Sequence, residues 1–492
     1  MSESGPSAPT PVRAPGAAAF RAARWSIVEI GTRYVIQFAV TAVLARLLSP
    51  DAFGLLAMVL VFTAIGAIFI DSGSGAALVQ KQSTTADEET TVFVVNVLVS
   101  LIAGLMLFAC ADVIASFFHQ PELANLCRFM ALIFPLNGLA VVPDALLTQQ
   151  MRFNVRAKVE FGSAMTASAV ALVLAWQGYG AWSLAWQAVA SIGARAVLLL
   201  VITGWRPRGR FRPRALWSIW SFGGFMLLAG LIDTGYTRLQ ALLVGRFFAA
   251  RELGFYTMAQ NTQQVPTSLA AALLNRLGLP LFSSLRHDLT LLRRAVRGSL
   301  SMSMFVFVPL VAMLALFAMP VVELVFGSRW QATGPILAIL ALGALPWPSH
   351  VLNVSLLNAL GHPRLVLRNE VIKKSLAIAL LLAAYPFGIM AIAWSTVAAS
   401  LLAMGINMHY SGKFLGYGAS SQLRDMAGIV LGTLVAALLA YAVYIAMQRS
   451  LVALLAGCII GALAYLLLAW RTSHPALVDL LRLVRPQRGG IR

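Results

Sequence analysis

Residues 44–58 read LARLLSPDAFGLLAM, and residues 244–258 repeat the same pattern 200 positions later as VGRFFAARELGFYTM. The two stretches align without a gap and share three identities: Arg46 with Arg246, Gly54 with Gly254, and Met58 with Met258. In each copy a short polar break separates two long apolar segments. A chance match between two apolar hairpins is the alternative. Duplicated halves are typical of membrane transporters, whose substrate site lies between the halves, and the repeat predicts this architecture.

The composition excludes a soluble globular protein. Hydrophobic residues make up 59% of the chain and charged residues only 11%, whereas soluble domains carry about 25% charged residues. The net charge of +19 would suggest a nucleic-acid partner in a soluble protein. Here the basic residues lie in short loops between apolar segments, so they indicate membrane topology and no nucleic-acid partner. The three cysteines form neither a disulfide framework nor a metal-ligand spacing.

The apolar segments predict an all-α integral membrane protein with about fourteen transmembrane helices, because one spanning helix needs about 20 mostly apolar residues. Six spans separate the two repeat copies, and an even number gives both halves the same orientation. We therefore predict two six-helix lobes, related by a pseudo-twofold axis along the membrane normal, plus two extra C-terminal helices. The predicted spans are residues 25–48, 52–76, 91–116, 122–146, 157–177, 180–203, 218–245, 252–275, 299–325, 333–358, 366–385, 387–411, 425–447 and 450–471.

The remaining segments complete this organisation. The N-terminal residues are rich in Pro, Ala, Ser and Gly, which is typical of disorder. The predicted order is a disordered cytoplasmic tail (1–24), the N-lobe (25–204), a basic cytoplasmic linker (205–217), the C-lobe (218–411), two further spans (425–471) and a basic cytoplasmic tail (472–492).

Basic residues alternate between the two sides of the predicted membrane. The arginine-rich run 206–214, Lys373, Lys374 and both chain ends fall on one side, and few basic residues fall on the other. By the positive-inside rule, both termini are expected to be cytoplasmic. Residues 282–297 carry leucines at helical spacing among basic residues, which predicts a helix lying on the inner leaflet. A solvated linker is the alternative.

Two of the predicted spans carry polar residues at matching depth. Charged side chains inside a membrane are costly and usually face protein or a water-filled cavity. Glu29, Arg33 and Gln37 share one face of the first span, and Tyr34 lies beside them. The seventh span carries Asp233, Tyr236, Arg238 and Gln240, and the repeat offset places Arg33 opposite Asp233. This pattern predicts a hydrophilic cavity between the halves. A Glu29–Arg33 ion pair that only fixes packing, or an Arg33 that reaches the cytoplasmic surface, is the alternative.

The eighth span contains a cluster of amides that includes Gln260, Asn261 and Gln264. Amides supply both donors and acceptors and therefore suit sugar hydroxyls. Hydrogen bonding between helices would also explain them. For Arg46 and Arg246, which end matching helices, a cation beside a helix C-terminal dipole is the preferred interpretation.

Neither a catalytic constellation nor a cofactor site is predicted. The six histidines are scattered without ligand spacing, and the chain has no glycine-rich phosphate-binding loop. We therefore expect a protein that is not an enzyme and needs neither metal nor cofactor.

Short motifs along residues 25–420 resemble one family of membrane proteins. They include Leu48-Ser-Pro-Asp-Ala-Phe-Gly54, Asp71-Ser-Gly73, Ala77-Leu-Val-Gln80, Phe117-Phe118, Arg206-Pro207, Gly245-Arg-Phe247, Leu253-Gly-Phe-Tyr256, Pro280-Leu-Phe-Ser-Ser-Leu285 and Leu360-Gly-His-Pro363. In order and spacing they resemble the bacterial polysaccharide-unit and O-antigen-unit flippases, Wzx and WzxC-like, of the multidrug/oligosaccharidyl-lipid/polysaccharide exporter superfamily. Leu279-Pro-Leu-Phe282 departs from the pattern, because an aromatic residue is expected before the proline.

The resemblance implies two lobes arranged as a V, which export undecaprenyl-diphosphate-linked oligosaccharide across the bacterial inner membrane by alternating access. It also implies contact with membrane lipids and with a polysaccharide polymerase and export machinery. Arg33, with Arg238 and Arg276, would bind the diphosphate. The full set of candidate substrate-binding residues is Arg33, Tyr34, Gln37, Asp233, Tyr236, Arg238, Gln240, Gln260, Asn261, Gln264 and Arg276.

Three other functions compete with this hypothesis. A multidrug/cation antiporter of the same superfamily would need a mainly acidic and aromatic cavity. A lipid II flippase would carry more arginines in its first, second and eighth helices. An integral-membrane glycosyltransferase or polymerase would need acidic motifs on large external loops, and this chain has no such loop.

Overall fold

A computed structural model describes residues 36–71, 84–448 and 450–472, together with residues 75, 78, 79, 81 and 476–478. Within these ranges, side chains are not described at residues 71, 214–229, 232, 269, 272, 273, 275–277, 279 and 280. All regular elements in the described part of the chain are helices. The predicted N-terminal tail, Arg33 and Tyr34 lie outside the described residues.

The helices follow the predicted order of spans. The described part of the first helix covers Ile36–Leu47. It is followed by α2 (Pro50–Asp71), α4 (Ala86–Ala109), α5 (Ala111–Phe118), α6 (Glu122–Met130), α7 (Ile133–Gln149), α8 (Phe153–Trp176), α9 (Ala181–Thr203), α10 (Pro213–Phe247), α11 (Ala250–Ser284), α12 (Leu289–Leu316), α13 (Ala318–Phe326), η1 (Ser328–Trp330), α14 (Thr333–Ala344), α15 (Trp347–Ala359), α16 (Pro363–Ala384), η2 (Tyr385–Phe387), α17 (Ile389–Leu415), α18 (Ala419–Ala446) and α19 (Leu451–Arg471).

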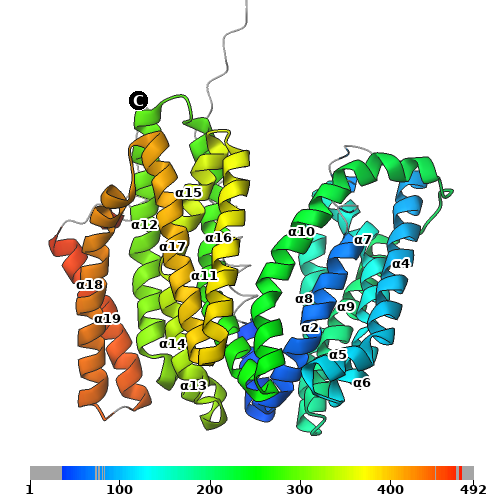
Figure 1. Ribbon diagram of the computed structural model, residues 1–492, viewed down its shortest axis with the longest axis horizontal. Coiled ribbons are helices and arrows are strands. Elements are labelled where there is room, and N and C mark those ends of the chain that lie inside the picture. The colour runs from blue at the N-terminus through cyan, green and yellow to red at the C-terminus, as the bar shows by residue number, and fades with distance from the viewer. Residues whose placement is uncertain are drawn as a thin grey trace, which may run out of the picture.

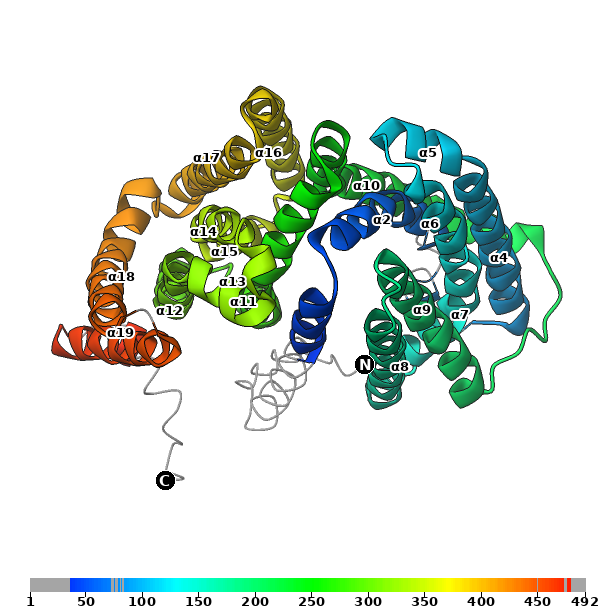
Figure 2. The same ribbon diagram turned by 90° about the horizontal axis from the view of Figure 1, so that it is seen from below.

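The helices form two bodies that meet at one end and diverge at the other, as a V (Figure 1). One body contains α2 and α4–α9, and the other contains α11–α17 with α18 and α19 at its outer edge. The diverging end carries the linker before α10, which is the side predicted to be cytoplasmic. Figure 2 shows the first helix, α2, α10 and α11 lying between the outer helices of the two bodies.

Among the residues that the structure describes, ten helical segments are long and apolar enough to cross a membrane. The predicted all-helical membrane fold is therefore confirmed, while the count of fourteen spans stays a prediction. The long helices α10, α11 and α16 do not belong to these ten segments. α10 and α11 carry charged and amide residues that the sequence analysis singled out, and α16 carries the Lys373-Lys374 pair.

Broken spans recur at matching positions of the two halves. The third predicted span divides into α4 and α5 at Cys110, and the ninth divides into α12 and α13 at Phe317. The fourth and tenth spans divide in the same way, into α6 with α7 and α14 with α15. Pro346 precedes α15 and has no N–H to continue the hydrogen bonding of α14. The shared breaks support the repeat, because they do not follow from apolar composition.

The segment 282–297 does not form the helix predicted to lie on the inner leaflet. Instead α11 continues to Ser284, and α12 begins at Leu289 after a four-residue turn. Asp288 caps α12, since its carboxylate accepts 2.9 Å hydrogen bonds from the backbone N–H groups of Thr290 and Leu291. Of the three leucines at helical spacing, Leu292 is fully buried in α12, whereas Leu289 at the helix start is 54% exposed and Leu285 lies in the turn before the helix. The prediction was wrong because a buried helix and a surface helix share the same periodicity.

The basic linker before α10 is bound to the first turns of α4. The Trp205 indole N–H donates to Glu89 at 2.8 Å, and the Gly209 N–H donates to the Thr90 hydroxyl at 2.9 Å. Arg212 pairs with Asp87 at 2.8 Å. These contacts attach the start of α10 to the first-half body.

The first turns of α2 and α11 cross in direct backbone contact at the converging end of the V. A Cβ atom on Gly54 would collide with the carbonyl oxygen of Ala250, and one on Gly254 would collide with that of Pro50. The contact is thus reciprocal, and each partner comes from the repeated stretch of one half. Only glycine permits this approach on both sides.

We expect Gly54→Ala and Gly254→Ala each to destabilise the protein by about 1–3 kcal/mol, because overpacking against a backbone carbonyl cannot be relieved by a rotamer change. The measurement is thermal unfolding of the purified protein in detergent. Gly298→Ala in α12 is the matched control, because its added methyl group would meet open space. Equal melting temperatures for all three variants would contradict the reciprocal contact.

Candidate functional site

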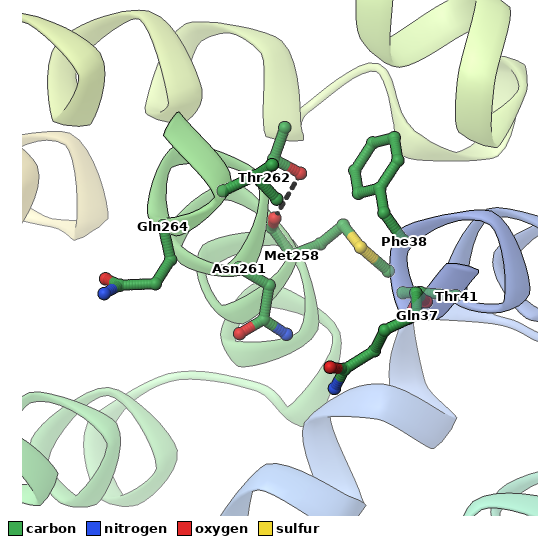
Figure 3. A pocket seen from close by; sticks show the side chains of 8 residues that line it. Gln37, Phe38, Thr41, Met258, Asn261, Thr262 and Gln264 are labelled. Atoms are coloured by element: carbon green, nitrogen blue, oxygen red, sulfur yellow. Dashed lines mark hydrogen bonds between the residues drawn. The ribbon is translucent and has the colours of Figure 1, made fainter. Parts of the chain in front are cut away.

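A cavity of about 180 Å³ lies between the first helix and α11, next to the crossing of α2 and α11. Figure 3 shows its lining side chains projecting from these two helices. They are Gln37, Phe38, Thr41, Met258, Asn261, Thr262, Gln264 and Val265. The cavity therefore joins a helix of the first half to a helix of the second half. Its second-half residues belong to α11, the eighth predicted span, and none belongs to the seventh span that the repeat places opposite the first helix.

Three of the predicted site residues meet at this cavity. Gln37, Asn261 and Gln264 are exposed. Figure 3 shows the amide groups of Gln37 and Asn261 at the space between the helices, whereas the amide of Gln264 extends away from the first helix. The two threonines differ, because each donates its hydroxyl proton to a carbonyl of its own helix, Thr41 to Gln37 at 2.9 Å and Thr262 to Met258 at 2.8 Å. The three amides therefore supply the donors of the cavity, and Phe38 and Met258 supply apolar surface.

Other predicted amides hold helices together. Gln240 of α10 donates to the hydroxyl of Thr396 on α17 at 3.0 Å. Its oxygen accepts a hydrogen bond from Gln260 at 3.0 Å and one from the Tyr256 hydroxyl at 3.3 Å. Gln240 and Gln260 thus link α10, α11 and α17, which is the interhelical alternative left open by the sequence.

A charged pair joins α10 to α16. The Lys374 ammonium lies 2.6 Å from the Asp233 carboxylate and 5.5 Å from the centre of the Tyr236 ring. The Asp233 side chain is 65% exposed, so the pair is not enclosed by protein. The sequence placed Asp233 and Tyr236 in the site but assigned Lys374 to the basic cytoplasmic residues. Its position in the middle of α16, three turns from the helix start, was the signal that could have identified it.

A second polar cluster lies behind this pair. The Lys373 side chain is buried, pairs with Glu370 and lies 3.4 Å from the Asn407 amide oxygen. The Asn407 amide nitrogen is 2.7 Å from Nδ1 of His350. These residues join α15, α16 and α17. In the first half, Asp144, Arg156, Glu160 and Arg195 join the corresponding helices α7, α8 and α9. Each body thus contains an ionic network at the same place.

Four predicted site residues remain, and the structure describes the side chain of only one of them. Arg238 is exposed on α10. Arg33 and Tyr34 lie outside the described residues, and the side chain of Arg276 is not described. The predicted opposition of Arg33 and Asp233 therefore stays a prediction. Among the described residues, no group of three His, Cys, Asp or Glu side chains could hold a metal ion.

A family model described as "Polysaccharide biosynthesis protein" matches residues 43–335, which is more than half of the chain. The chain belongs to this family. The match covers both copies of the repeat and confirms the family inferred from the motifs.

Several curated relatives carry names from polysaccharide biosynthesis. The chain is 27% identical over 318 residues to the succinoglycan biosynthesis transport protein ExoT of Rhizobium meliloti (strain 1021), covering 65% of this chain and 64% of ExoT. It is 25% identical over 347 residues to the lipopolysaccharide biosynthesis protein WzxC of Escherichia coli (strain K12), covering 69% and 68% of the two chains. The matched region is thus slightly less than two thirds of the length of ExoT.

Solved structures establish the fold. The lipid II flippase MurJ, in an inward closed conformation, superposes with a TM-score of 0.75 and 13% identity, covering 95% of this chain and all of MurJ. An inward-facing multidrug resistance transporter of the MATE family superposes with a TM-score of 0.60 and 16% identity, covering 78% and 94% of the two chains. That transporter belongs to the MOP superfamily. The chain therefore has the fold predicted from the resemblance.

The Asp233–Lys374 pair should behave as a coupled unit. We expect Asp233→Asn and Lys374→Met to destabilise the protein singly, because each leaves one charge without its partner at membrane depth. The double variant should recover part of the loss, with a coupling energy of about 0.5–3 kcal/mol. A double-mutant cycle of unfolding in detergent measures this energy. Strictly additive losses would show that the 2.6 Å contact contributes nothing.

Proposed function

We propose that this protein is a flippase that moves undecaprenyl-diphosphate-linked oligosaccharide units across the bacterial inner membrane by alternating access, with both termini in the cytoplasm. The observation that carries the proposal is the amide-lined cavity between the first helix and α11. Its position at the junction of the halves is where transporters built from repeats bind substrate. Membership in the polysaccharide biosynthesis family supports the same class of substrate.

The chemistry of the cavity suits a glycan. Sugar hydroxyls both donate and accept hydrogen bonds, and the amides of Gln37, Asn261 and Gln264 offer both functions. The apolar surface of Phe38 and Met258 can pack against the C–H face of a sugar ring. A diphosphate requires fixed cations in a low-dielectric cleft. We assign that role to Arg33, with Arg238 and Arg276, and the lipid tail would remain in the bilayer.

The rival functions fit the cavity less well. A drug/cation antiporter would need acidic and aromatic lining, whereas the described lining contains one aromatic residue and no carboxylate. A lipid II flippase shares the fold, so the fold cannot separate it from an oligosaccharide flippase. The family match to polysaccharide biosynthesis proteins favours the oligosaccharide. A polymerase and export machinery would receive the flipped units.

The amides provide the first test. We expect Asn261→Leu with Gln264→Leu to reduce polymer export at least tenfold in cells that lack the native gene, because the cavity loses two of its three amides. Gln263→Leu is the matched control on the same helix, since its amide donates to Thr267 one turn away at 2.8 Å. Lipid-linked units should accumulate on the cytoplasmic side. Parental export by the double variant at equal protein level would overturn the assignment of this cavity.

Arg33 provides the second test. We expect Arg33→Ala to abolish export while the protein stays inserted and abundant, because the diphosphate loses a fixed cation. Arg33→Lys should recover only part of the activity, since a point charge lacks the bidentate contact that a guanidinium makes with phosphate. Export and protein level are measured together in membrane fractions. Full export by Arg33→Ala would remove this residue from the site, and loss of the protein would indicate a packing role.

A further inference from the structure

The converging end of the V is held by more than the crossing of α2 and α11. Arg46 and Arg246, which occupy the same position in the two repeats, both reach across to a helix end of the other half. We call the two arginines and their partners the outer latch. The partners are the end of α13 (Leu324 and Val325) and the end of α5 (Phe117 and His119).

Arg46 ends the first helix and binds the second half. Its Nε donates to the Val325 carbonyl at 3.0 Å, and its Nη2 donates to the Leu324 carbonyl. Both carbonyls belong to the last turn of α13, where a helix leaves its C=O groups without partners. The guanidinium therefore caps the negative end of a helix that is 279 residues away in the sequence. The expected helix-dipole role is correct in kind, but the helix belongs to the other half.

Arg246 ends α10 and binds the first half. Its Nη1 lies 2.6 Å from Nδ1 of His119, and its guanidinium carbon lies 5.2 Å above the Phe117 ring. His119 is the residue that ends α5, with a left-handed φ of 55°. The arginine thus meets the end of α5 through a ring nitrogen and an aromatic face.

The two contacts are equivalent in the repeat. α5 and α13 are the second pieces of the broken third and ninth spans, and both end on the converging side of the molecule (Figure 1). Each arginine therefore joins the first span of one half to the third span of the other. Arginines that only cap the ends of their own helices would not be expected to make such equivalent contacts with the other half.

We infer that the outer latch holds the non-cytoplasmic side closed. Both the Arg46 contact and the Arg246 contact must break before the crossing of α2 and α11 can open. This inference depends on the alternating access of the proposed function and does not depend on the identity of the substrate. It assigns to Arg46 and Arg246 a role in the balance between conformations and none in substrate binding.

The contacts of Arg46 and of Arg246 are weak enough to form and break reversibly. Arg46 is exposed and Arg246 is half-buried, so water can replace their contacts when the crossing opens. A cation at a helix C-terminus contributes enough to change a two-state ratio by about two- to fivefold. The contacts of Trp330 are different, because its ring is fully buried and its indole N–H donates to the Ala45 carbonyl at 2.8 Å. The outer latch is thus the part of the contact between the halves that can be removed while the buried Trp330 contact remains.

The test measures how often the crossing opens. In the full-length protein without its native cysteines, Ala250→Cys places a thiol at the crossing, where Ala250 is 5% exposed. Labelling by a membrane-impermeant maleimide from outside the cell then reports the fraction of time that the crossing is open. We expect Arg46→Gln and Arg246→Gln each to raise the labelling rate about two- to fivefold, and the double variant to multiply the two effects.

Two controls make the result specific. Arg251→Gln removes the same charge beside the labelled site, from an arginine placed over Phe255 of its own helix, and should leave the rate unchanged. A second thiol at Ala196→Cys, buried in α9 at 2% exposure, reports unfolding. Parental labelling by the double variant, an equal increase with Arg251→Gln, or parallel acceleration at Ala196→Cys would each overturn the latch. Because no substrate is added, these outcomes are separate from failure of the flippase proposal.

Discussion

The backbone contact between α2 and α11 is the constraint on which the rest of the structure depends. Gly54 and Gly254 let two helix starts approach until each Cβ position is occupied by a carbonyl of the other helix. Without a hydrophobic driving force between helices in lipid, such close packing of small residues is what associates them. The contact fixes the converging end of the V, and it places the cavity of the first helix and α11 beside it.

Polar side chains in this protein fall into two groups, those that bond to other protein groups and those exposed at the cavity. A bilayer offers no water, so each buried polar group must find a partner inside the protein. Gln240 and Gln260 satisfy each other together with Tyr256 and Thr396, and the ionic networks within each body join three helices. Asn261 and Gln264 differ, because they are exposed at the cavity. The same residue type thus has a structural role at Gln260 and remains open to a ligand at Gln264, one turn further along α11.

Helix order and the repeat could be predicted from the sequence, because apolar length and the spacing of identities are local or periodic signals. The cavity partners Gln37, Asn261 and Gln264 were also predictable, since amides inside a span are costly without a purpose. Lys374 was missed, because a basic residue near a predicted loop fits the positive-inside rule as well as a membrane ion pair. The prediction of a surface helix at 282–297 was wrong, since leucine spacing cannot distinguish a helix facing lipid headgroups from one facing a protein core. The reach of Arg46 to α13 depends on long-range packing, which no local pattern records.

Two of the three identities in the repeated stretch lie where the halves meet near the pseudo-twofold axis. Near such an axis, two equivalent residues each contact the equivalent surroundings in the other half. The same type of side chain therefore fits at both positions. Gly54 with Gly254 and Arg46 with Arg246 follow this rule, through the helix crossing and the helix-end contacts. The polar positions inside the first and seventh spans diverge instead, with Gln37 opposite Thr237 at the repeat offset. The substrate we propose, a glycan attached to a lipid through a diphosphate, has no twofold symmetry, so residues that bind it would gain nothing from matching. Identity in the contact and divergence in the cavity are therefore what the proposed function would favour in a duplicated protein.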